Sequence, residues 1–326
     1  MKKTMWALLD DRMGSVGQAK GVILALNNLV NVEEKKVTYT RWAKLPNWMK
    51  GCSLLGTNKE ASSPLRAPWP DFVLSISRRT TPIARWIKKQ SQGKTKIIQL
   101  MHPGNCGLKD LDLIIVSEHD AKKSKGGNFF FITGCPHRVS ETTILQAKEK
   151  WEPIFSSLPR PWVSVIIGGA IKRHPFSLEN AKALGQEIRE LHRQIGGSIL
   201  ISTSRRTGAE AEKIIMNELK GIPSYTYLWG EKKENPIMGF YACADKIIVT
   251  GDSVSMASEA CGSGNPVLVF EGQGWLTKKH KRFIASLYTK GYAIALEDKK
   301  ALEFKPQKSL NPAQEIMKEI KKLIKD

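Results

Sequence analysis

Strand, turn and helix signals follow one another in Asn235–Phe270, which reads NPIMGFYACADKIIVTGDSVSMASEACGSGNPVLVF. The run Ile247–Thr250 has the length and composition of a strand that is buried on both faces. Gly251 then opens a turn signal, and Val254 begins a segment with helical spacing. A second apolar run, Val267–Phe270, comes after that helix. This strand–helix–strand order is typical of a parallel α/β sheet.

Short apolar runs alternate with helical patterns along the whole chain. Strands are expected at Met5–Leu9, Phe72–Ser75, Ile97–Leu100, Leu113–Val116, Phe129–Ile132, Val163–Ile167, Ile199–Ser202, Ser224–Leu228, Ile247–Thr250 and Val267–Phe270. Between two of these runs, Leu178–Gly196 places its apolar side chains on one helical stripe. The pattern therefore predicts an α/β fold built on parallel sheets.

The length of 326 residues suits two domains of about 150 residues each. A break is expected at Ser156–Pro161, inside the proline-rich and serine-rich stretch WEPIFSSLPRP. We therefore expect a first domain over 1–158, a second over 159–310, and a hinge between them. A helix over 311–326 has one apolar face, which predicts that it packs back on the first domain.

The charge is unusual, because 51 Lys and Arg against 31 Asp and Glu give +20. Such a surplus favours an anionic partner, and a solvated Lys-rich surface is the alternative. Tryptophans 42, 48 and 69 occur among cations, as at a membrane interface or a stacking platform for single-stranded nucleic acid. Partly buried core tryptophans are the other explanation. The neighbouring cations are Arg41, Lys44, Lys50 and Arg66.

The cysteines and the N-terminal sequence indicate the cellular compartment of the protein. The five cysteines are scattered and form no CxxC, so we expect neither disulfides nor a zinc site. The apolar run Met5–Leu9 ends at Asp10, which is too short for a signal peptide. No window approaches the roughly 20 apolar residues of a spanning helix. We expect a cytoplasmic protein that is soluble or rests on the inner face of the membrane.

Phosphate-binding signals gather after the expected strands of the second half. The helix start after Gly251 offers free backbone N–H groups and the positive end of the helix dipole. Glu259 lies one turn beyond Ser255, in a position to accept hydrogen bonds from ribose hydroxyls. Arg205 and its neighbour Arg206 follow another strand and match phosphate geometry. Simple N-capping of the helix is the alternative to a ligand site.

The first half repeats this logic less sharply. Gly14 and Gln18 follow the first strand, in a loop-and-helix start that could cradle an acceptor or a phosphate but matches no nucleotide fingerprint. Ser77-Arg78-Arg79-Thr80 echoes Ser204-Arg205-Arg206-Thr207, so Arg78 and Arg79 are candidates for a second anion. An ordinary strand-to-helix turn is the alternative at both places.

Acid–base candidates occur in the first half as well. Glu118-His119-Asp120 lies just beyond an expected strand, and a histidine beside a carboxylate can act as a general base. A surface histidine is the alternative. No GxSxG, HExxH or kinase motif is present, which argues against serine hydrolase, zincin and kinase chemistry. The candidates are Asp10, Asp11, His102, Glu118, His119 and Asp120.

Along almost its whole length the chain resembles the mitochondrial-fission Elm family, which contains bacterial proteins and plant relatives. The matching stretches are Gly14–Gly21, SRRTTPIAR at Ser77–Arg85, DLIIVSEHD at Asp112–Asp120, VIIGGAIKRH at Val165–His174, STSRRT at Ser202–Thr207, Asn235-Pro236, and ADKIIVTGDSVSMASEA, which begins at Ala244. The last stretch is the most specific. Relatives tend to carry an acidic residue where His102 precedes Pro103, which weakens a catalytic role for His102.

The family is similar to the GT-B glycosyltransferases. This resemblance implies two Rossmann-like domains with parallel sheets that face a cleft, the second domain holding a nucleotide-diphosphate sugar. It implies metal-independent transfer of that sugar to an envelope or lipid-linked acceptor, with no covalently bound cofactor. A non-catalytic peripheral membrane or scaffold protein with the same fold is the alternative. A nucleic-acid binder ranks last, because no recognised module is present.

We assign expected roles on this combined basis. Asp11 or His119 is the expected catalytic base, and Gly14, Gln18, Arg78 and Arg79 are expected at the acceptor or a second anion. The expected nucleotide-binding residues are Gly168, Gly169, Ser204, Arg205, Arg206, Asn235, Thr250, Gly251, Asp252, Ser253, Ser255, Met256 and Glu259. Among the other partners we expect an anionic membrane surface or a lipid-linked acceptor.

Overall fold

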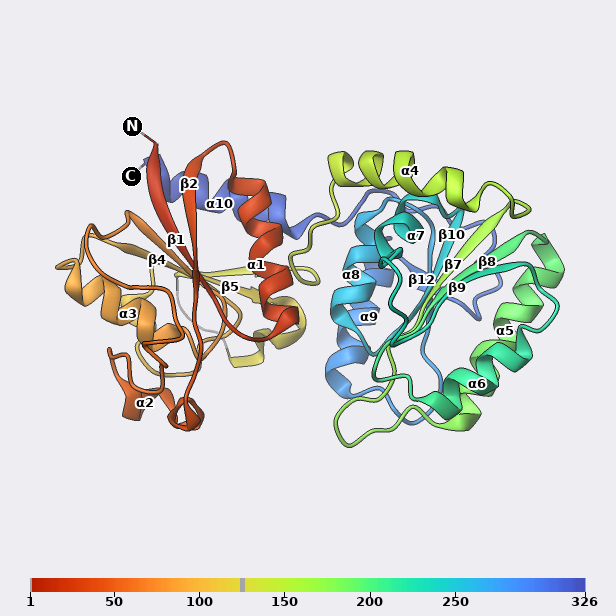
Figure 1. Ribbon diagram of the computed structural model, residues 1–326, viewed down its shortest axis with the longest axis horizontal. Helices are drawn as coiled ribbons and strands as arrows, with labels where there is room; N and C mark the ends of the chain where they lie inside the picture. Colours follow the sequence, from red (N-terminus) through yellow and green to blue (C-terminus); the bar gives the residue numbers. More distant parts are fainter. Residues whose placement is uncertain (1, 124–126, 326) are drawn as a thin grey trace. The chain divides into compact units, whose positions relative to one another are not determined.

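The computed structural model describes residues 2–123 and 127–325, and it divides the chain into two compact units (Figure 1). Unit 1 contains the residues up to Arg138 together with the segment from Asn311 onward. Unit 2 contains Val139–Leu310. Each unit is built on a six-stranded parallel sheet of described residues, so the α/β class expected from the apolar runs is confirmed.

The sheet of unit 1 has the strand order β2-β1-β3-β4-β5-β6. Its strands are β1 (Lys3–Leu9), β2 (Val30–Lys36), β3 (Phe72–Ser75), β4 (Lys96–Leu100), β5 (Leu113–Ser117) and β6 (Phe129–Ile132). Five of them coincide with expected strands. Strand β2 was not expected, because its sequence VNVEEKK is mostly charged and exposed, as suits an edge strand.

The helices of unit 1 come from both ends of the chain. They are α1 (Met13–Leu26), α2 (Asn47–Lys50), α3 (Thr81–Gln90) and α10 (Pro312–Lys325), with the 3₁₀ turns η1 (Arg41–Lys44), η2 (Leu108–Asp110) and η3 (Glu118–Lys123). Helix α10 lies along α1 and places Ile316 and Ile320 in the core beside Val22 and Leu26. The C-terminal segment therefore completes the first unit.

The sheet of unit 2 has the strand order β12-β11-β10-β7-β8-β9. Its strands are β7 (Trp162–Ile166), β8 (Ser198–Ser202), β9 (Ser224–Tyr227), β10 (Lys246–Thr250), β11 (Val267–Phe270) and β12 (Ile294–Ala295). Alternate residues enter opposite cores: Ile247 and Val249 face one side, and Ile248 faces the other. Burial on both faces explains the uninterrupted apolar runs.

The helices of unit 2 cover both faces of this sheet. They are α4 (Glu141–Phe155), α5 (Leu178–Ile195), α6 (Ala209–Glu218), α7 (Ile237–Cys243), α8 (Val254–Gly262) and α9 (Lys278–Thr289). Figure 1 shows α5 and α6 on one side of the sheet and α8 and α9 on the other. Side chains of α5 and α6 form one core, and those of α4, α7, α8 and α9 form the other.

Helix α4 belongs to unit 2, whereas the expected boundary at 158/159 would place it in the first domain. Trp151 and Phe155 of α4 pack with Phe240 in a core of unit 2. A Cβ on Gly239 would lie 2.3 Å from Cγ of Trp151, so the two helices touch closely at that glycine. The units therefore divide at Arg138/Val139, and the expected hinge Ser156–Pro161 lies inside unit 2.

The strand orders identify where each sheet should bind a ligand. At a switch point, the connections that leave two neighbouring strands run to opposite sides of the sheet. Open α/β sheets bind their ligands there, beyond the carboxyl ends of the strands. The switch point lies between β1 and β3 in unit 1 and between β7 and β10 in unit 2. Both points follow directly from the pairing order.

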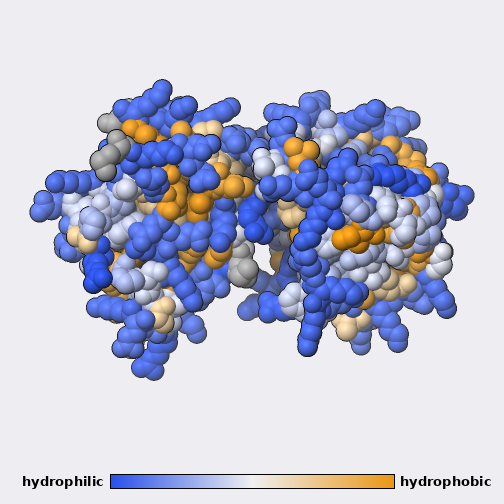
Figure 2. Space-filling view, turned by 45° about the horizontal axis from the view of Figure 1, so that its top comes forward, coloured by the Kyte–Doolittle hydropathy of each residue, from blue (hydrophilic) through white to orange (hydrophobic). Residues whose placement is uncertain are grey.

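The surface of each unit is mostly hydrophilic on the face drawn in Figure 2, where apolar patches are small. Within residues 2–123 and 127–325, no helix combines the length and the apolar character that crossing a bilayer requires.

Candidate functional site

The sequence SRRT follows one strand in each unit and folds into the same turn both times. In unit 2 the Thr207 hydroxyl accepts a hydrogen bond from the Ser204 amide at 3.0 Å. In unit 1 the Thr80 hydroxyl accepts one from the Ser77 amide at 3.1 Å. Each turn therefore presents two consecutive arginines at the carboxyl end of a strand.

The second arginine of each turn is engaged by a buried carboxylate. Arg206 donates from Nη1 to Oδ2 of Asp252, and Arg79 donates from Nη2 to Oδ2 of Asp10 at 3.2 Å. Both aspartate side chains are fully buried. A buried charge without a partner is strongly unfavourable, so each guanidinium stabilises a carboxylate that folding removes from water. Arg79 and Arg206, which we expected to hold phosphate, have their guanidinium groups bound within the protein.

The Arg206–Asp252 ion pair joins the loops that follow β7, β8 and β10. Asp252 Oδ2 also accepts a hydrogen bond from the Gly169 amide at 3.0 Å, and Thr250 Oγ1 accepts one from the Gly168 amide at 2.8 Å. Burial raises the pKa of the Asp252 carboxyl, while Arg206 opposes that shift. The ends of three neighbouring strands are thereby held as one piece.

The two glycines after β7 are required by this packing. A Cβ on Gly168 would lie 2.2 Å from Oδ2 of Asp252. Gly169 has a φ of +135°, and a Cβ there would lie 2.0 Å from the Arg206 carbonyl oxygen. Gly168 and Gly169, which we counted among the expected nucleotide-binding residues, are therefore required where the neighbouring loops of unit 2 pack against them.

The start of α8 has a side-chain cap, and its first turn is half-buried. Ser253 is the N-cap and accepts a hydrogen bond from the Met256 amide at 3.4 Å, so the capping interpretation applies to this residue. Ser255 is half-buried one turn before Glu259. The Glu259 carboxylate is half-buried and accepts a hydrogen bond from the hydroxyl of the buried Tyr241 at 3.2 Å.

The other expected nucleotide-binding residues have separate local roles. Gly251 lies against α9, since a Cβ there would be 2.6 Å from Cδ1 of Ile284. Asn235 is exposed before α7, and its side chain accepts a hydrogen bond from the Ile237 amide at 3.0 Å. Among the residues that the structure describes, no hydrogen bond or ion pair joins the Asn235 side chain to the loops held by Asp252.

Arg205 differs from its neighbour Arg206. Its side chain is exposed and makes no hydrogen bond or ion pair within the described part of the chain. Trp229, which the sequence did not single out, lies close by: its amide donates to the Thr203 hydroxyl at 2.8 Å, and its side chain is 62% exposed. The sequence signal that could have identified it was a tryptophan directly after the expected strand Ser224–Leu228.

Unit 1 has a cationic cavity of 680 Å³ at its own switch point, where the chain leaves β1 and β3. Its described lining consists of Asp11, Arg12, Tyr39, Thr40, Arg41, Ala43, Lys44, Lys50, Arg78 and Arg79. Six of these side chains are cationic, and the carboxylate is that of Asp11. Gly14 and Gln18 lie in the first two turns of α1 and do not line the cavity.

The two candidate bases are in different surroundings. Asp11 is half-exposed and pairs with Arg79, whose guanidinium lowers the pKa of the carboxyl below its ordinary value of 3.8. His119 is buried, and its Nε2 lies 3.8 Å from Oδ2 of Asp120. Asp11 is therefore accessible but weakly basic, whereas His119 is withdrawn from the surface.

Other acid–base candidates have structural partners. Glu118 accepts a hydrogen bond from the Thr133 hydroxyl at 3.2 Å, and His102 accepts one from the Gly104 amide at 3.1 Å. The His102 ring also stacks on Phe129 with centroids 5.9 Å apart.

The tryptophans of unit 1 divide into two kinds. Trp42 and Trp48 are exposed, at 50% and 71% of their surface. Trp69 instead packs edge-to-face between Trp6 and Trp86, with centroids 5.8 and 5.7 Å apart. The core interpretation therefore applies to Trp69.

A family model described as "Mitochondrial fission ELM1" matches residues 13–324. The chain belongs to this ELM1 family. It is 28% identical to the mitochondrial fission protein ELM1 of Arabidopsis thaliana over 221 residues, which are 61% of this chain and 51% of that protein. It is also 28% identical to the uncharacterized protein RP120 of Rickettsia prowazekii (strain Madrid E), over 98% of both chains. The chain thus spans about half the length of the plant relative.

Solved structures share the fold of this ELM1-family chain. UDP-GlcNAc 2-epimerase from Methanocaldococcus jannaschii superposes with a TM-score of 0.56 at 13% identity, over 98% of this chain and 99% of that one. The Neisseria meningitidis enzyme bound to UDP-GlcNAc gives 0.54 at 14% identity over 99% and 100%. A glycosyltransferase from Rickettsia africae gives 0.51 at 11% identity over 99% and 88%. The fold is therefore that of the GT-B glycosyltransferases and related epimerases.

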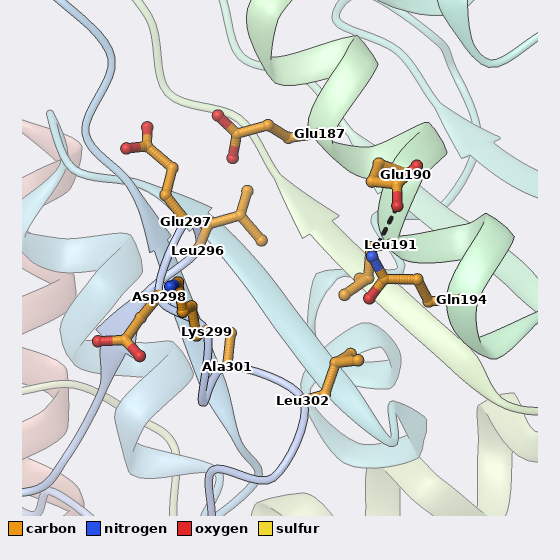
Figure 3. A pocket seen from close by; sticks show the side chains of 10 residues that line it. All are labelled: Glu187, Glu190, Leu191, Gln194, Leu296, Glu297, Asp298, Lys299, Ala301 and Leu302. Carbon is orange, nitrogen blue, oxygen red and sulfur yellow. Dashed lines mark hydrogen bonds between the residues drawn. The ribbon is translucent and has the colours of Figure 1, made fainter.

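Unit 2 has an acidic cavity of 460 Å³, which lies between α5 and the segment that follows β12 (Figure 3). Glu187 from α5 and Glu297 from the following loop lie near each other there. Burial, and then the neighbouring Glu297, raise the pKa of Glu187 from 4.5 to about 7. Within residues 2–123 and 127–325, no group of three His, Cys, Asp or Glu is arranged to hold a metal ion.

The two arginines of the unit 2 turn are expected to contribute very differently to stability. Arg206→Met leaves Asp252 buried without its cation, and we expect unfolding to become easier by about 3 kcal/mol. This is the low end for a broken buried pair, because Arg206 is 35% exposed. Arg205→Met should change stability by less than about 0.5 kcal/mol, since that side chain is exposed and unpaired in the described part of the chain. Urea denaturation measures both, and equal stability of the two variants would contradict the assignment.

The Glu187 carboxyl predicts a pH dependence of stability. Because its pKa is raised in the folded state, the folded protein binds this proton more tightly than the unfolded chain does. The resulting stabilisation is full below pH 4.5 and is lost as the pH rises through about 7. Glu187→Gln should therefore flatten the fall in melting temperature over this range. Glu190→Gln, at an exposed position of the same helix, is the control, and unchanged pH profiles in both variants would refute the assignment.

Proposed function

We propose that unit 2 binds a nucleotide-diphosphate sugar beyond the carboxyl ends of β7, β8 and β10, and that the protein transfers the sugar to an anionic envelope or lipid-linked acceptor. The observation that carries this proposal is that the two arginines of one turn have different partners. Arg206 is held by Asp252, whereas the adjacent Arg205 is exposed without a partner in the described part of the chain. A rigid edge that presents a guanidinium at the switch point suits a phosphate ligand.

Each part of the donor has a matching group at this edge. Arg205 and the backbone N–H groups at the start of α8, near Ser255, would hold the diphosphate. Glu259 would accept hydrogen bonds from the ribose in competition with Tyr241. The exposed ring of Trp229 offers a surface on which a nucleobase can stack. Arg206 would act by positioning Asp252 and the glycine loop, without touching the ligand.

The comparisons support the class of ligand. The epimerases with this fold act on UDP-GlcNAc according to their names, and one was solved with it bound. The Rickettsia africae protein is a glycosyltransferase. Transfer to an acceptor is favoured over a reaction of the bound sugar alone because unit 1 has a cationic cavity at its own switch point. A nucleotide sugar bound by unit 2 does not require this further site.

Fixed donors at unit 2 would stabilise the leaving diphosphate. Arg205 and the α8 start can neutralise the charge that develops as the sugar–oxygen bond breaks, without a metal. Asp11 is the more accessible of the two expected bases, although its pairing with Arg79 makes it a weak one. Because of this pairing, a non-catalytic ELM1-family protein that keeps nucleotide binding is the second candidate.

Nucleotide binding is expected to depend on Arg205, Glu259 and Trp229. Arg205→Met and Glu259→Gln should each weaken the binding of UDP or UDP-GlcNAc by roughly 1–3 kcal/mol, and Trp229→Ala by about 1 kcal/mol. Isothermal titration calorimetry on the full chain measures these losses, with Arg193→Met on the exposed side of α5 as a control. Wild-type affinity in all three folded variants would remove the site from unit 2. Binding without turnover in the presence of lipid extract would favour the non-catalytic candidate.

We further propose that unit 1 contacts an anionic membrane surface through η1 and α2. Trp42, Trp48 and Met49 expose apolar side chains there, beside the exposed cations Arg41 and Lys44. Trp69 and Lys50, which the sequence grouped with them, are not part of this surface, because Trp69 packs in an aromatic cluster and Lys50 is buried. Exposed tryptophans among cations suit the interface of a charged leaflet.

Liposome flotation tests this membrane contact. Recovery should require anionic lipid and fall steeply with salt, because exposed cations contribute about 1 kcal/mol each near such a surface. Trp48→Ala should lower recovery without changing its salt dependence, whereas Lys44→Glu should weaken that dependence. Lys220→Glu on unit 2 is the matched charge control. Equal recovery with neutral and anionic vesicles would reject the contact.

A further inference from the structure

The wall of the unit 1 cavity contains a buried cation without a counter-ion. Lys50 is only 4% exposed, and its Nζ donates one hydrogen bond, to the Ala43 carbonyl at 3.3 Å. Within the described residues no carboxylate lies at ion-pair distance from this ammonium group. Burial and the guanidiniums of Arg78 and Arg79 lower the pKa of Lys50. Such an arrangement costs stability unless an anion completes it.

The position of Lys50 is specified by its surroundings. Asn47, at the start of the same short helix α2, is buried and donates from Nδ2 to the carbonyl oxygens of Arg78 at 2.8 Å and Pro103 at 3.1 Å. These bonds fasten α2 to the turn that follows β3. The Lys50 ammonium is therefore held beside the first arginine of that turn.

The rest of the lining adds positive charge and an unused polar atom. Arg12 and Arg78 are exposed and have no side-chain partner in the described residues. The carboxylates of Asp10 and Asp11 both form ion pairs with Arg79, and among the described residues neither forms one with Lys50 or Arg78. The Tyr39 hydroxyl is buried and has no hydrogen-bond partner among the described residues, and the Arg79 guanidinium lies 4.3 Å from the centre of the Tyr39 ring.

We propose that this cavity binds a phosphate group, as a monoester or a diphosphate, with Lys50 at its centre and Arg78 and Arg12 at its sides. A multiply charged anion is the ligand class that several convergent cations around one buried ammonium select. The volume of 680 Å³ exceeds that of a phosphate, which leaves room for the group attached to it. This inference concerns unit 1 alone, so it does not depend on nucleotide binding by unit 2.

Arg78 occupies in unit 1 the place that Arg205 occupies in unit 2. Both are first arginines of an SRRT turn, both are exposed, and both lie beside a second arginine that pairs with a buried aspartate. The same local structure thus presents one unengaged guanidinium at the switch point of each sheet. In unit 1 the buried ammonium of Lys50 adds a second, convergent charge.

Calorimetric titration with sodium pyrophosphate at constant ionic strength tests the site. The full chain carrying Arg205→Met is used as the parent, so that pyrophosphate binding by unit 2 is weakened in every sample. Adding Lys50→Met or Arg78→Gln should lower the affinity for pyrophosphate roughly tenfold or more. Adding Lys89→Met, at an exposed position of α3 outside the cavity, should leave it unchanged. An affinity for pyrophosphate equal to that of the Arg205→Met parent in both cavity variants would overturn the proposal.

A second readout separates a ligand-binding role of Lys50 from a structural one. Lys50→Met should leave the melting temperature without ligand unchanged or higher, because a buried charge is removed. The increase on adding pyrophosphate should disappear at the same time. A lowered melting temperature together with an intact pyrophosphate effect would instead mean that Lys50 only supports Ala43, and would overturn the proposal. If Lys50→Met does not fold, the pyrophosphate titration of Arg78→Gln, a substitution at an exposed position, decides the question by itself.

Two further binding experiments distinguish a soluble phosphate ester from a lipid headgroup as the ligand of the cavity. Glycerol 3-phosphate represents a soluble ester, and vesicles of phosphatidylcholine with phosphatidic acid represent a lipid headgroup. Loss of vesicle binding in Lys50→Met, with no binding of glycerol 3-phosphate, assigns the lipid. The reverse result assigns a soluble phosphate ester, and no Lys50-dependent binding in either arm counts against the site.

Discussion

The ion pair between Arg206 and Asp252 organises the carboxyl edge of unit 2. It neutralises a carboxylate that is fully buried between three loops, and the same carboxylate accepts the Gly169 amide. The short glycine loop, the turn after β8 and the start of α8 all meet at this carboxylate. Without the guanidinium, a buried charge would remain at the point where the loops converge, and the edge would lose its shape.

The Arg79–Asp10 pair repeats this arrangement in unit 1, where it lies next to a basic cavity. In both units one arginine of a consecutive pair is used to build the loop edge, and the other is left exposed there. Part of the positive charge therefore lies where the strand order places ligands: six cationic side chains line the unit 1 cavity, and Arg205 is exposed at the switch point of unit 2.

Local sequence predicted the strands well and the packing between distant segments less well. Phe72–Ser75 and Val267–Phe270 are uninterrupted apolar runs, and both are strands with the expected bounds. The charged edge strand β2 has no such signal. Helix α4 was grouped with the first half because nothing within it indicates which core Trp151 and Phe155 enter. That choice depends on Phe240 and Gly239, far along the chain.

The same limit applies to the candidate sites. The repeated SRRT turns were recognisable, but the roles of their two arginines were not, because Arg206 is assigned by an aspartate 46 positions away. Likewise, Lys50 looked like a surface cation beside Trp48, and only the bonds of Asn47 across to the β3 turn show why it is buried. Residue type and strand position were enough to predict which loops contain the candidate sites. The role of each side chain in those loops depends on contacts with residues far along the chain.

A crystal structure of the full chain grown with UDP tests most directly the claim that the two arginines of the unit 2 turn have separate tasks. The account predicts that the diphosphate lies against the Arg205 guanidinium and the first turn of α8, with the Arg206–Asp252 pair intact. A diphosphate bound by Arg206 in place of Asp252, or a nucleotide bound away from the carboxyl ends of β7, β8 and β10, would contradict it.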